Sequence, residues 1–378
     1  MKTAYKFRMY PNKQQEAMLD VTLETCRHLY NTALADRKNT YEQQGKNRSY
    51  EDQAAILTIE KPDNPYLSSM YAHCLQDVLR RLDKSFKAFF RRVKAGENPG
   101  YPRFKGKGWY KSFTYPDAGT GYKLEGSKLT LSKIGSIRIF KHREVEGKLK
   151  TCTIKKDHLG HWYATLVSES EVEDVLQVEP KIAIGIDVGL KSLVTLSDGT
   201  SIQYPRYYVQ AEKKLGTAQR SLSRKKKGSA NRHKAKIKVA KISRRVQYLR
   251  DEFLHQVSRK LVDSADLIIF ENLNISGMLK NHHLAKHIQD HAWGKLIQFT
   301  QSKAAKAGKI VELVDARYTS QKCSQCSTMV PKTLAERTHA CPNCGLNMDR
   351  DLNASMNIRT LGLRGSAYRD TARESAGQ

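Results

Sequence analysis

The sequence predicts a multidomain α/β protein, and three observations carry this prediction. Residues 181–204 include a nearly continuous apolar segment, which is typical of a central strand buried on both faces. Residues 13–42 and 68–94 carry apolar side chains at helical spacing. Residues 111–172 contain short segments of alternating hydrophobicity separated by turn residues, which is typical of antiparallel strands.

The first half of the chain is expected to hold a small helical lobe and a small β-domain. Residues 3–10 alternate in hydrophobicity and predict a strand, which Pro11 ends because proline has no amide proton to donate. The two helices follow, and the Pro/Gly-rich residues 98–108 mark a boundary. The short strands of 111–172 then form a β-domain, open or closed into a barrel, which the first strand can join.

The second half is expected to alternate strands and helices. Residues 181–204 predict a strand, a tight turn and two further strands, and a long helical region runs from about residue 208 to 263. The polar tail from Arg364 is expected to fray. The other elements, in order, are a buried strand at 265–273, a helix near 291–307, a strand at 309–316 and a final helix at 349–362.

The chain is strongly basic. It contains 66 Lys and Arg residues against 38 Asp and Glu residues, which gives a formal net charge of +28. An excess this large indicates a polyanionic partner. No apolar run reaches the roughly eighteen residues that a membrane-spanning helix needs. Residues 1–15 lack a continuous apolar stretch, so we expect no secretory signal and a protein that stays in the cytosol.

Four of the seven cysteines form two C-x-x-C pairs close to the C-terminus. The pairs are Cys323 with Cys326 and Cys341 with Cys344. Thiols stay reduced in the cytosol, so the choice lies between a redox dithiol and a metal site, and the duplicated pairs favour one structural Zn²⁺. Of the scattered Cys26, Cys74 and Cys152, the first two lie on apolar helical stripes, which favours core packing.

Three acidic residues lie where predicted elements begin or end. Asp187 and Glu271 end the first and second buried strands, and Asp351 opens the final helix. Three carboxylates at one edge of a core repel one another unless cations sit between them. Two Mg²⁺ or Mn²⁺ ions about 4 Å apart can activate a water and stabilise the leaving oxygen of a phosphodiester. Each acid can instead cap a turn or helix, and Asp349 is a local rival to Asp351.

Basic residues concentrate in two segments. From residue 213 to 250 there is no acidic side chain, which indicates phosphate neutralisation rather than an ordinary solvated face. The leading phosphate contacts in this segment are Arg224, Lys225, Lys226, Lys227 and Arg232. In the second segment, residues 101–111, basic and aromatic side chains interleave. Arg103, Lys105 and Lys107 are candidates to grip an RNA backbone, while Phe104 or Trp109 stacks on bases or packs in the core.

At these residues the sequence resembles a known family. The stretches "GIDVGLKSLVTLSDG", "IIFENL" and "DRDLNASMNI", together with the paired C-x-x-C knot, resemble the split RuvC-like nuclease of the TnpB proteins. These proteins are encoded by bacterial and archaeal insertion sequences and are similar to compact type V CRISPR effectors. The stretches "FRMYPNKQQ", "CRHLYNTAL", "YPRFKGKG" and "SRKKKGSANRHKAKIKVAKI" also resemble the family, so the likeness covers roughly residues 4–360.

The resemblance implies an RNase H-like (RuvC) nuclease with a four-cysteine zinc-knot insertion, preceded by a small β-barrel wedge domain and a helical recognition lobe. The implied order is a first wedge strand (1–10), the helical lobe (11–100), the rest of the wedge domain (101–178), the nuclease with its basic helical insertion (179–320), the zinc knot (321–347), the last nuclease segment (348–362) and a flexible tail (363–378).

The resemblance also implies an activity and a set of partners. TnpB proteins bind a guide RNA from their own element's end, recognise a short motif beside the target, and cleave both strands of the DNA. The family's acids map to Asp187, Glu271 and Asp351, because the last one stands in D-x-N-A. Met348 departs from the family pattern, in which a His often holds that position. The candidates for reading the target-adjacent motif are Tyr50, His73, Gln76 and Thr114.

This interpretation predicts a cytoplasmic, nucleoid-associated endonuclease with two Mg²⁺ or Mn²⁺ ions, one Zn²⁺ and one protein per guide RNA. Three alternatives stay open. The chain can be an RNA-guided DNA-binding protein without cleavage, a transposase or recombinase that uses the same acids, or a guide-free RNase that processes its own transcript. The presence of all three acids favours an active nuclease, since binding-only relatives have lost some of them.

Overall fold

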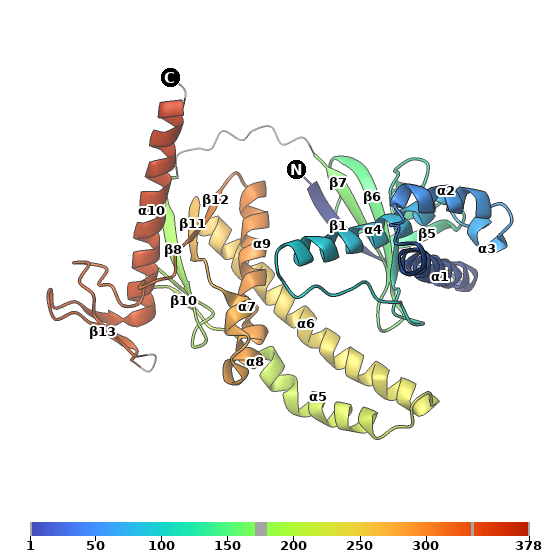
Figure 1. The fold of residues 1–378 in the computed structure, drawn as a ribbon. Helices are drawn as coiled ribbons and strands as arrows, with labels where there is room; N and C mark the ends of the chain where they lie inside the picture. Colours follow the sequence, from blue (N-terminus) through green and yellow to red (C-terminus); the bar gives the residue numbers. More distant parts are fainter. Residues whose placement is uncertain (1, 171–179, 334–335, 377–378) are drawn as a thin grey trace. The chain divides into compact units, whose positions relative to one another are not determined.

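The computed structural model describes residues 2–170, 180–333 and 336–376 (Figure 1). The chain divides into two compact units, residues 1–172 and 173–378, each with its own apolar core. Within the described residues, no helix combines the length and the apolar character needed to cross a membrane.

Unit 1 contains a seven-stranded sheet with the strand order β2-β6-β7-β1-β5-β4-β3. Strand β1 pairs antiparallel with both β5 and β7, which confirms that the first strand joins the β-domain. This order places β2 and β3 at its two ends, and closure into a barrel stays a prediction. The bounds are β1 Lys2–Tyr10, β2 Ser112–Tyr115, β3 Tyr122–Glu125, β4 Lys128–Leu131, β5 Gly135–Phe140, β6 Lys148–Lys156 and β7 Trp162–Glu169.

The helices of unit 1 are α1 Lys13–Gln44, α2 Tyr50–Glu60, α3 Pro65–Ser68 and α4 Ala72–Lys94. A reciprocal cap between Asn12 and Gln15 starts α1, as it does in many helices. The predicted stripe of α4 is buried from Cys74 to Phe86, but Phe90 and Val93 near its end are exposed. Helices α2 and α3 were not predicted, because neither is long enough to show a clear apolar period.

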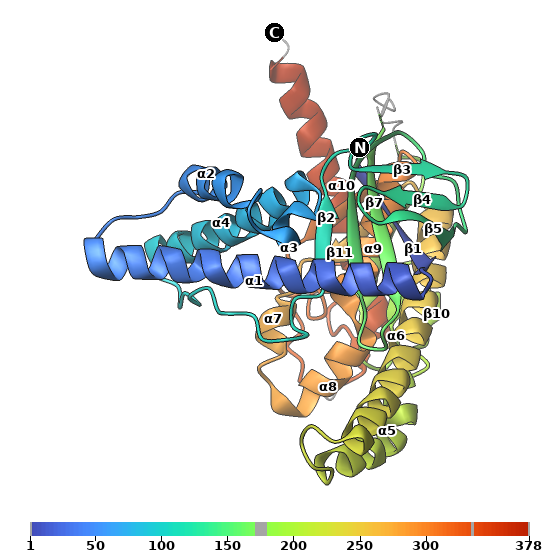
Figure 2. The same ribbon diagram turned by 90° about the vertical axis from the view of Figure 1, so that its right-hand side faces the viewer.

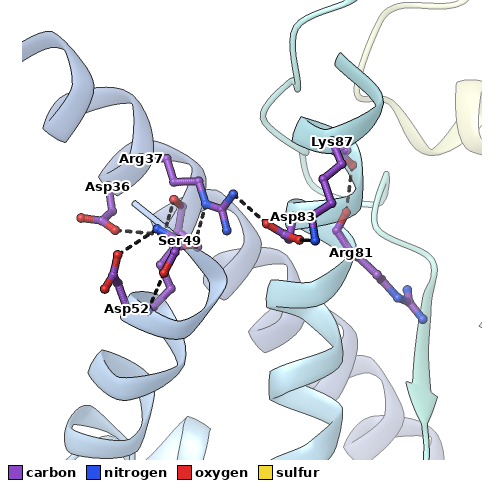
Figure 3. Close-up of polar contacts among 10 residues, drawn as sticks. Asp36, Arg37, Ser49, Asp52, Arg81, Asp83 and Lys87 are labelled. Atoms are coloured by element: carbon purple, nitrogen blue, oxygen red, sulfur yellow. Dashed lines mark hydrogen bonds and ion pairs between the residues drawn. The ribbon is translucent and has the colours of Figure 1, made fainter. Parts of the chain in front are cut away.

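A buried arginine ties three of these helices together (Figure 3). Arg37 of α1 donates from Nε to Gln53 Oε1 of α2 at 2.9 Å, and its Nη1 lies 3.3 Å from Asp83 Oδ1 of α4. Lys87 pairs with the other oxygen of Asp83 at 2.8 Å. Because a buried charge is tolerated only when it is paired, this network fixes how the helical lobe packs.

Unit 2 is built on a five-stranded sheet with the order β10-β9-β8-β11-β12. Strand β11 pairs in parallel with β8 and β12, while β9 and β10 are antiparallel. All five side chains of β11 are buried, as the apolar run predicted. The bounds are β8 Ala183–Val188, β9 Val194–Leu196, β10 Ser201–Ile202, β11 Leu267–Glu271 and β12 Ile310–Val314.

The long helical region expected at 208–263 is a hairpin of two helices, α5 and α6, which lie side by side (Figures 1 and 2). Gly228 adopts a left-handed φ of 86° in the turn, and Ser229 Oγ accepts from Arg232 N to start α6. The helices of unit 2 are α5 Tyr207–Ser223, α6 Ala230–Ser264, α7 Ile275–Met278, α8 His282–His291, α9 Trp293–Lys306 and α10 Arg350–Ala376.

The two faces of the central sheet pack against different helices. Ile268 and Phe270 of β11 belong to a core that includes residues of α6 and α9. Leu267 and Ile269 instead pack with Ile358 of α10. Because side chains alternate along a strand, odd-numbered positions of β11 face α10. Glu271, two residues beyond Ile269, is therefore on the α10 face.

Candidate functional site

The two strand-end acids occupy neighbouring positions in the sheet. The parallel register pairs Phe270 of β11 with Ile186 of β8, so Glu271 and Asp187 come at the next position of adjacent strands. Asp187 lies two residues after Gly185, and Gly185 is the position at which β8 meets α10. Both carboxylates are therefore on the face that α10 covers.

Helix α10 brings the third acid to the same place. A Cβ atom on Gly185 would lie 2.1 Å from the carbonyl oxygen of Ser355 and 2.4 Å from the amide nitrogen of Arg359. Only a residue without a side chain permits so close an approach. Asp351 precedes Ser355 by one helical turn, and its Oδ2 lies 4.0 Å from the position of a Cβ on Gly189, just beyond β8. The docking of α10 thus sets Asp351 beside the end of β8.

The carboxylates influence one another. Burial, the Glu271 carboxylate and the Asp351 carboxylate raise the pKa of Asp187 well above its usual value, and Arg350 opposes this effect. Burial also raises the pKa of Glu271, while a hydrogen bond from Thr319 lowers it and Asp351 raises it again. The acids that repel one another are those that the strand register and the docking of α10 place at one edge of the sheet.

The rivalry between Asp349 and Asp351 is resolved by hydrogen bonds. Asp349 Oδ1 accepts from the backbone amides of Asp351 at 2.8 Å and Leu352 at 3.4 Å, so Asp349 caps α10. Asp351 is buried in the first turn, where Arg350 Nε and Nη2 lie 3.3 Å from its Oδ1. Asp349 therefore serves as the cap of α10, and the assignment of Asp351 rather than Asp349 to the carboxylate site stays a prediction, which the proximity of Asp351 to Glu271 favours.

The donor set suits hard divalent cations. Three carboxylates supply oxygen ligands only, which Mg²⁺ and Mn²⁺ prefer, and bound cations would relieve the repulsion that raises the pKa of Asp187 and Glu271. Among the described residues, the four cysteines are the only group whose ligand atoms all lie within 4.8 Å of one another. The carboxylate oxygens of the three acids do not all lie this close together. That spacing is compatible with two bound ions, because the ligands of two ions span a longer distance than the ligands of a single ion.

Three polar residues that contribute to this region were not identified from the sequence. Thr319 donates its hydroxyl proton to Glu271 Oε1, and Asn353 and Asn357 bond the backbone that leads into the cysteine knot. The two asparagines stand four residues apart in "DLNASMN", which puts them on one face of a helix. That spacing was visible in the sequence, but the partners of the side chains were not.

The four predicted zinc ligands converge. Cys323 Sγ and Cys344 Sγ are 3.6 Å apart, and Cys326 Sγ and Cys341 Sγ are 3.5 Å apart. A tetrahedral Zn²⁺ with bonds of about 2.3 Å requires sulfur separations of roughly 3.8 Å. The residues thus fit one structural Zn²⁺, and all four are free cysteines in this structure.

A small hairpin completes the knot. Strands β13 (Thr338–Ala340) and β14 (Asn347–Asp349) pair antiparallel, and Met348 lies opposite His339 in that register. Strand β14 leads directly into α10, so the knot and the helix that carries Asp351 are joined by backbone. Cys26, Cys74 and Cys152 are buried in the core of unit 1, as expected for the first two.

The basic residues of the α5–α6 hairpin differ in their surroundings. Arg224, Lys225, Lys226 and Lys227 lie in the turn and are exposed. Arg232 is half-buried, and its Nη1 donates to the carbonyl oxygens of Leu222 and Lys225, each at 3.0 Å. Arg232 therefore holds the turn closed, while the four residues before it present their charges to solvent.

The interleaved segment near residue 105 is anchored at one point and exposed elsewhere. Asn31 of α1 accepts from Lys105 N at 2.8 Å and donates to Lys105 O at 3.0 Å, and Arg27 also donates to that oxygen. Phe104 is 55% exposed and Trp109 is 78% exposed, so neither packs in the core. Core packing is thus wrong for both aromatic residues, and stacking on bases stays a prediction. Arg103 and Lys107 are also exposed.

The four candidates for motif reading lie on or beside α4 in unit 1. His73 is on the first turn, bonded to Asp117, and Gln76 follows it by three residues. The ring of Tyr50 lies under Arg80 of α4, 5.5 Å from its guanidinium carbon. The hydroxyl of Thr114 already accepts from Arg81 and contacts Thr153, so it has partners within the protein.

Comparison with known proteins identifies relatives along the whole chain. A family model described as "Probable transposase" (OrfB_IS605) matches residues 166–282. A model described as "Cas12f1-like, TNB domain" matches 293–358, and one described as "Helix-turn-helix domain" matches 1–46. In this structure, the last of these segments forms strand β1 and the single helix α1.

Two relatives match over nearly the full length. A Streptomyces pristinaespiralis protein named "Putative RNA-guided DNA endonuclease" is 34% identical, with 99% of this chain and 92% of the relative covered. The Escherichia coli (strain K12) protein named "Putative RNA-guided DNA endonuclease InsQ" is 30% identical, covering 95% and 92%. The solved structure of the mini-RNA-guided endonuclease CRISPR-Cas_phi3 shares the fold, with a TM-score of 0.50 at 10% identity over 96% of this chain and 92% of that one.

The fold and the site define a class: an α/β protein with three acids on one face of its sheet and a four-cysteine knot before its last helix. The full-length relatives make the assignment specific. The chain belongs to the TnpB family of insertion-sequence proteins.

The approach of α10 to Gly185 gives a direct test of how the site is built. We expect Gly185→Ala to destabilise unit 2 by about 1–3 kcal/mol, because its Cβ overlaps the α10 backbone. Hydrogen exchange in β8 and in residues 350–363 should then become faster. Gly216→Ala in α5 is the control: nothing lies within 4 Å of its Cβ, so it should be neutral or stabilising. Equal exchange in both variants would contradict the close approach.

Proposed function

We propose that this chain is an RNA-guided DNA endonuclease of a transposable element. It binds a guide RNA from its own element, recognises a short motif beside the target and cleaves both strands of complementary DNA. The observation that carries the proposal is the meeting of Asp187, Glu271 and Asp351 on the α10 face of the sheet, in a chain with a net charge of +28. The names of the two full-length relatives support it.

The proposed chemistry follows from the positions of these side chains. Two Mg²⁺ or Mn²⁺ ions, when bound, would supply an activated water and neutralise charge on the phosphodiester. Asp187 and Glu271 hold their ligand oxygens on rigid adjacent strands, and Asp351 closes the site from α10. Thr319 fixes one oxygen of Glu271, and Arg350 lies beside Asp351. One site of this kind would cut the two strands in turn.

Guide and target would be held through their backbones. Arg224, Lys225, Lys226 and Lys227 present four adjacent cations at the end of the α5–α6 hairpin, which suits phosphates and not individual bases. In the same proposal Arg232 contributes charge, but its main task is to close the turn. Substituting the four exposed residues would weaken binding to any sequence, because phosphate contacts carry no sequence information.

The second interface is the exposed segment around Lys105. Phe104 and Trp109 offer two faces for unpaired bases, with Arg103 and Lys107 to contact the backbone between them. The clasp of Asn31 on the backbone of Lys105 holds the segment in place without using its side chain. Tyr50, His73, Gln76 and Thr114 remain the proposed readers of the target-adjacent motif, with Gln76 able to bond adenine.

A transposase that joins strands through the same acids is the second candidate, since one matching family model is described as a probable transposase. The two activities differ in what they require. A guided endonuclease needs an RNA complementary to the DNA and leaves free ends. A transposase joins strands without a guide. A binding-only protein would do neither.

The central test compares two neighbouring acids in a guided cleavage assay with Mg²⁺. Asp351→Asn should lower the cleavage rate by at least about a hundred-fold, because it removes a ligand from ions that contribute several kcal/mol. Asp349→Asn should leave helix stability nearly unchanged and retain most activity, because the asparagine oxygen can accept the same backbone amides at the cap. Equal loss in both variants, or strand joining by the wild type without a guide, would contradict the proposal.

The raised pKa values of Asp187 and Glu271 predict how the stability of the metal-free protein depends on pH. Folding raises the pKa of Asp187 and Glu271, so their contribution to stability is fully present below the unfolded-state pKa and is lost as pH rises through the folded-state value. Asp187→Asn should therefore slow hydrogen exchange of β8 and β11 at pH 7. Mn²⁺ should slow it in the wild type and much less in the variant.

The matched control for this prediction is Asp263→Asn, which changes an exposed carboxylate of the same unit. It should leave both the exchange rates and the response to Mn²⁺ at wild-type values. If Asp187→Asn instead speeds exchange in the metal-free protein, burial of the acids and the repulsion among them do not control the stability of this edge of the sheet.

A further inference from the structure

A short segment of chain lies between Glu271 and α10 and bonds to both. Thr319 is buried, and its hydroxyl donates to Glu271 Oε1. The same hydroxyl oxygen is 3.2 Å from Ala316 O, a weaker partner than the carboxylate. The single proton of Thr319 therefore serves Glu271, and this fixes the direction in which that carboxylate points.

The backbone before Thr319 adopts an uncommon conformation. Tyr318 has a φ of 63°, in the left-handed region that bulky residues rarely occupy. Its carbonyl oxygen accepts from Gln321 N at 3.0 Å and Lys322 N at 2.9 Å, which closes the turn on itself. A conformation of this kind persists only where its surroundings enforce it. The two asparagines of α10 hold the chain that follows Tyr318, at the carbonyl oxygens of Thr319 and Lys322.

Asn353 and Asn357 hold the other side of the segment. Asn357 Nδ2 donates to Thr319 O at 2.8 Å and to Lys322 O at 2.7 Å. Asn353 Nδ2 donates to Lys322 O at 2.8 Å, and its Oδ1 accepts from Ser324 N at 2.9 Å. Both side chains are buried on the helix that opens with Asp351. The segment thus bonds Glu271 through Thr319 and α10 through four hydrogen bonds.

The same segment enters the cysteine knot. Cys323, a proposed zinc ligand, stands between Lys322 and Ser324, and both of these neighbours are bonded by Asn353. Any movement of the knot would therefore move the backbone of the segment. A merely space-filling segment would not need a hydroxyl on the Glu271 carboxylate or two asparagines whose amide groups bond only its backbone.

We propose that residues 319–324, clasped by Asn353 and Asn357, form a positioning device that sets Glu271 relative to Asp351 and couples the cysteine knot to the carboxylate site. Thr319, Asn353 and Asn357 are positioning residues in this arrangement. The role of this device in cleavage rests on the proposed function. Its effect on metal binding by the three acids does not, and that effect can be measured without RNA or DNA.

The test is Mn²⁺ binding to the full-length, zinc-loaded protein, followed by calorimetry and by the electron paramagnetic resonance signal of bound Mn²⁺. Thr319→Val keeps the shape and removes the hydroxyl, and it should weaken Mn²⁺ binding about ten-fold. Thr319→Ser keeps the hydroxyl and should restore wild-type affinity and spectrum. Thr360→Val is the control, because it removes an exposed hydroxyl of α10 that bonds only its own helix. It should change nothing.

Asn357→Ala provides a second variant that leaves Thr319 in place, and it should also weaken Mn²⁺ binding. Combined with Thr319→Val, its effect should be less than additive, because both act on Glu271 through one segment. Additive effects, or wild-type Mn²⁺ affinity in both Thr319→Val and Asn357→Ala, would overturn the inference. If Thr319→Val does not fold, Asn357→Ala and Thr319→Ser decide the matter alone.

Failure of the proposed function is recognised separately. A wild-type protein that binds Mn²⁺ but does not cut guided DNA would overturn the function and leave the positioning device supported by the binding data. If the wild type cuts DNA that matches its guide, and both Thr319→Val and Asn357→Ala equal it in Mn²⁺ affinity, only the positioning device is overturned.

Discussion

The backbone of α10 lies directly against β8 at Gly185, and the carboxylate site depends on that contact. No side chain fits between the strand and the helix at this position. The contact places Asp351, one turn before Ser355, at the end of the strand that carries Asp187. Glu271 joins them because β11 is parallel to β8 and in register with it. Three acids from distant parts of the chain thus meet through one sheet and one helix.

This arrangement has an electrostatic cost that accounts for the surrounding structure. Burial and mutual repulsion disfavour the ionised acids, as the raised pKa values of Asp187 and Glu271 show. Without cations, the site therefore works against folding. Rigid strands, the cap from Asp349 and the bonds of Thr319 hold the carboxylates in place despite that repulsion. Strain of this kind is common at functional sites.

Much of the site could be predicted because its residues coincide with strong local signals. Asp187 and Glu271 end apolar runs, and the cysteines form duplicated pairs, so neither depends on distant contacts. Asp349 and Asp351 could be separated only by the resemblance, since both stand at a helix start; the hydrogen bonds of the cap provide the physical reason. Thr319 could not be predicted, because its partner Glu271 is 48 residues away in the sequence.

The fold was predictable to a similar degree. The sequence pattern predicted the strands and helices whose apolar residues repeat regularly over a long segment. It also predicted β1 and its place in the β-domain. The turn that divides α5 from α6 was missed because basic side chains obscured the signal of Gly228 and Ser229. The sequence pattern alone could not tell which aromatic side chains are buried. In the structure, Phe104 is exposed, and so is Phe90 near the end of the α4 stripe.

The proposal that RNA guides the cleavage is tested most directly by the RNA that accompanies the protein. The chain would be expressed with its native flanking DNA and purified, and the bound RNA would be sequenced. Guided recognition predicts a single RNA with a fixed scaffold and a 3′ end that runs beyond the element, because the proposed guide RNA comes from the end of that element. A random mixture of RNAs, or none, would contradict guided recognition and favour a transposase or a nuclease without a guide.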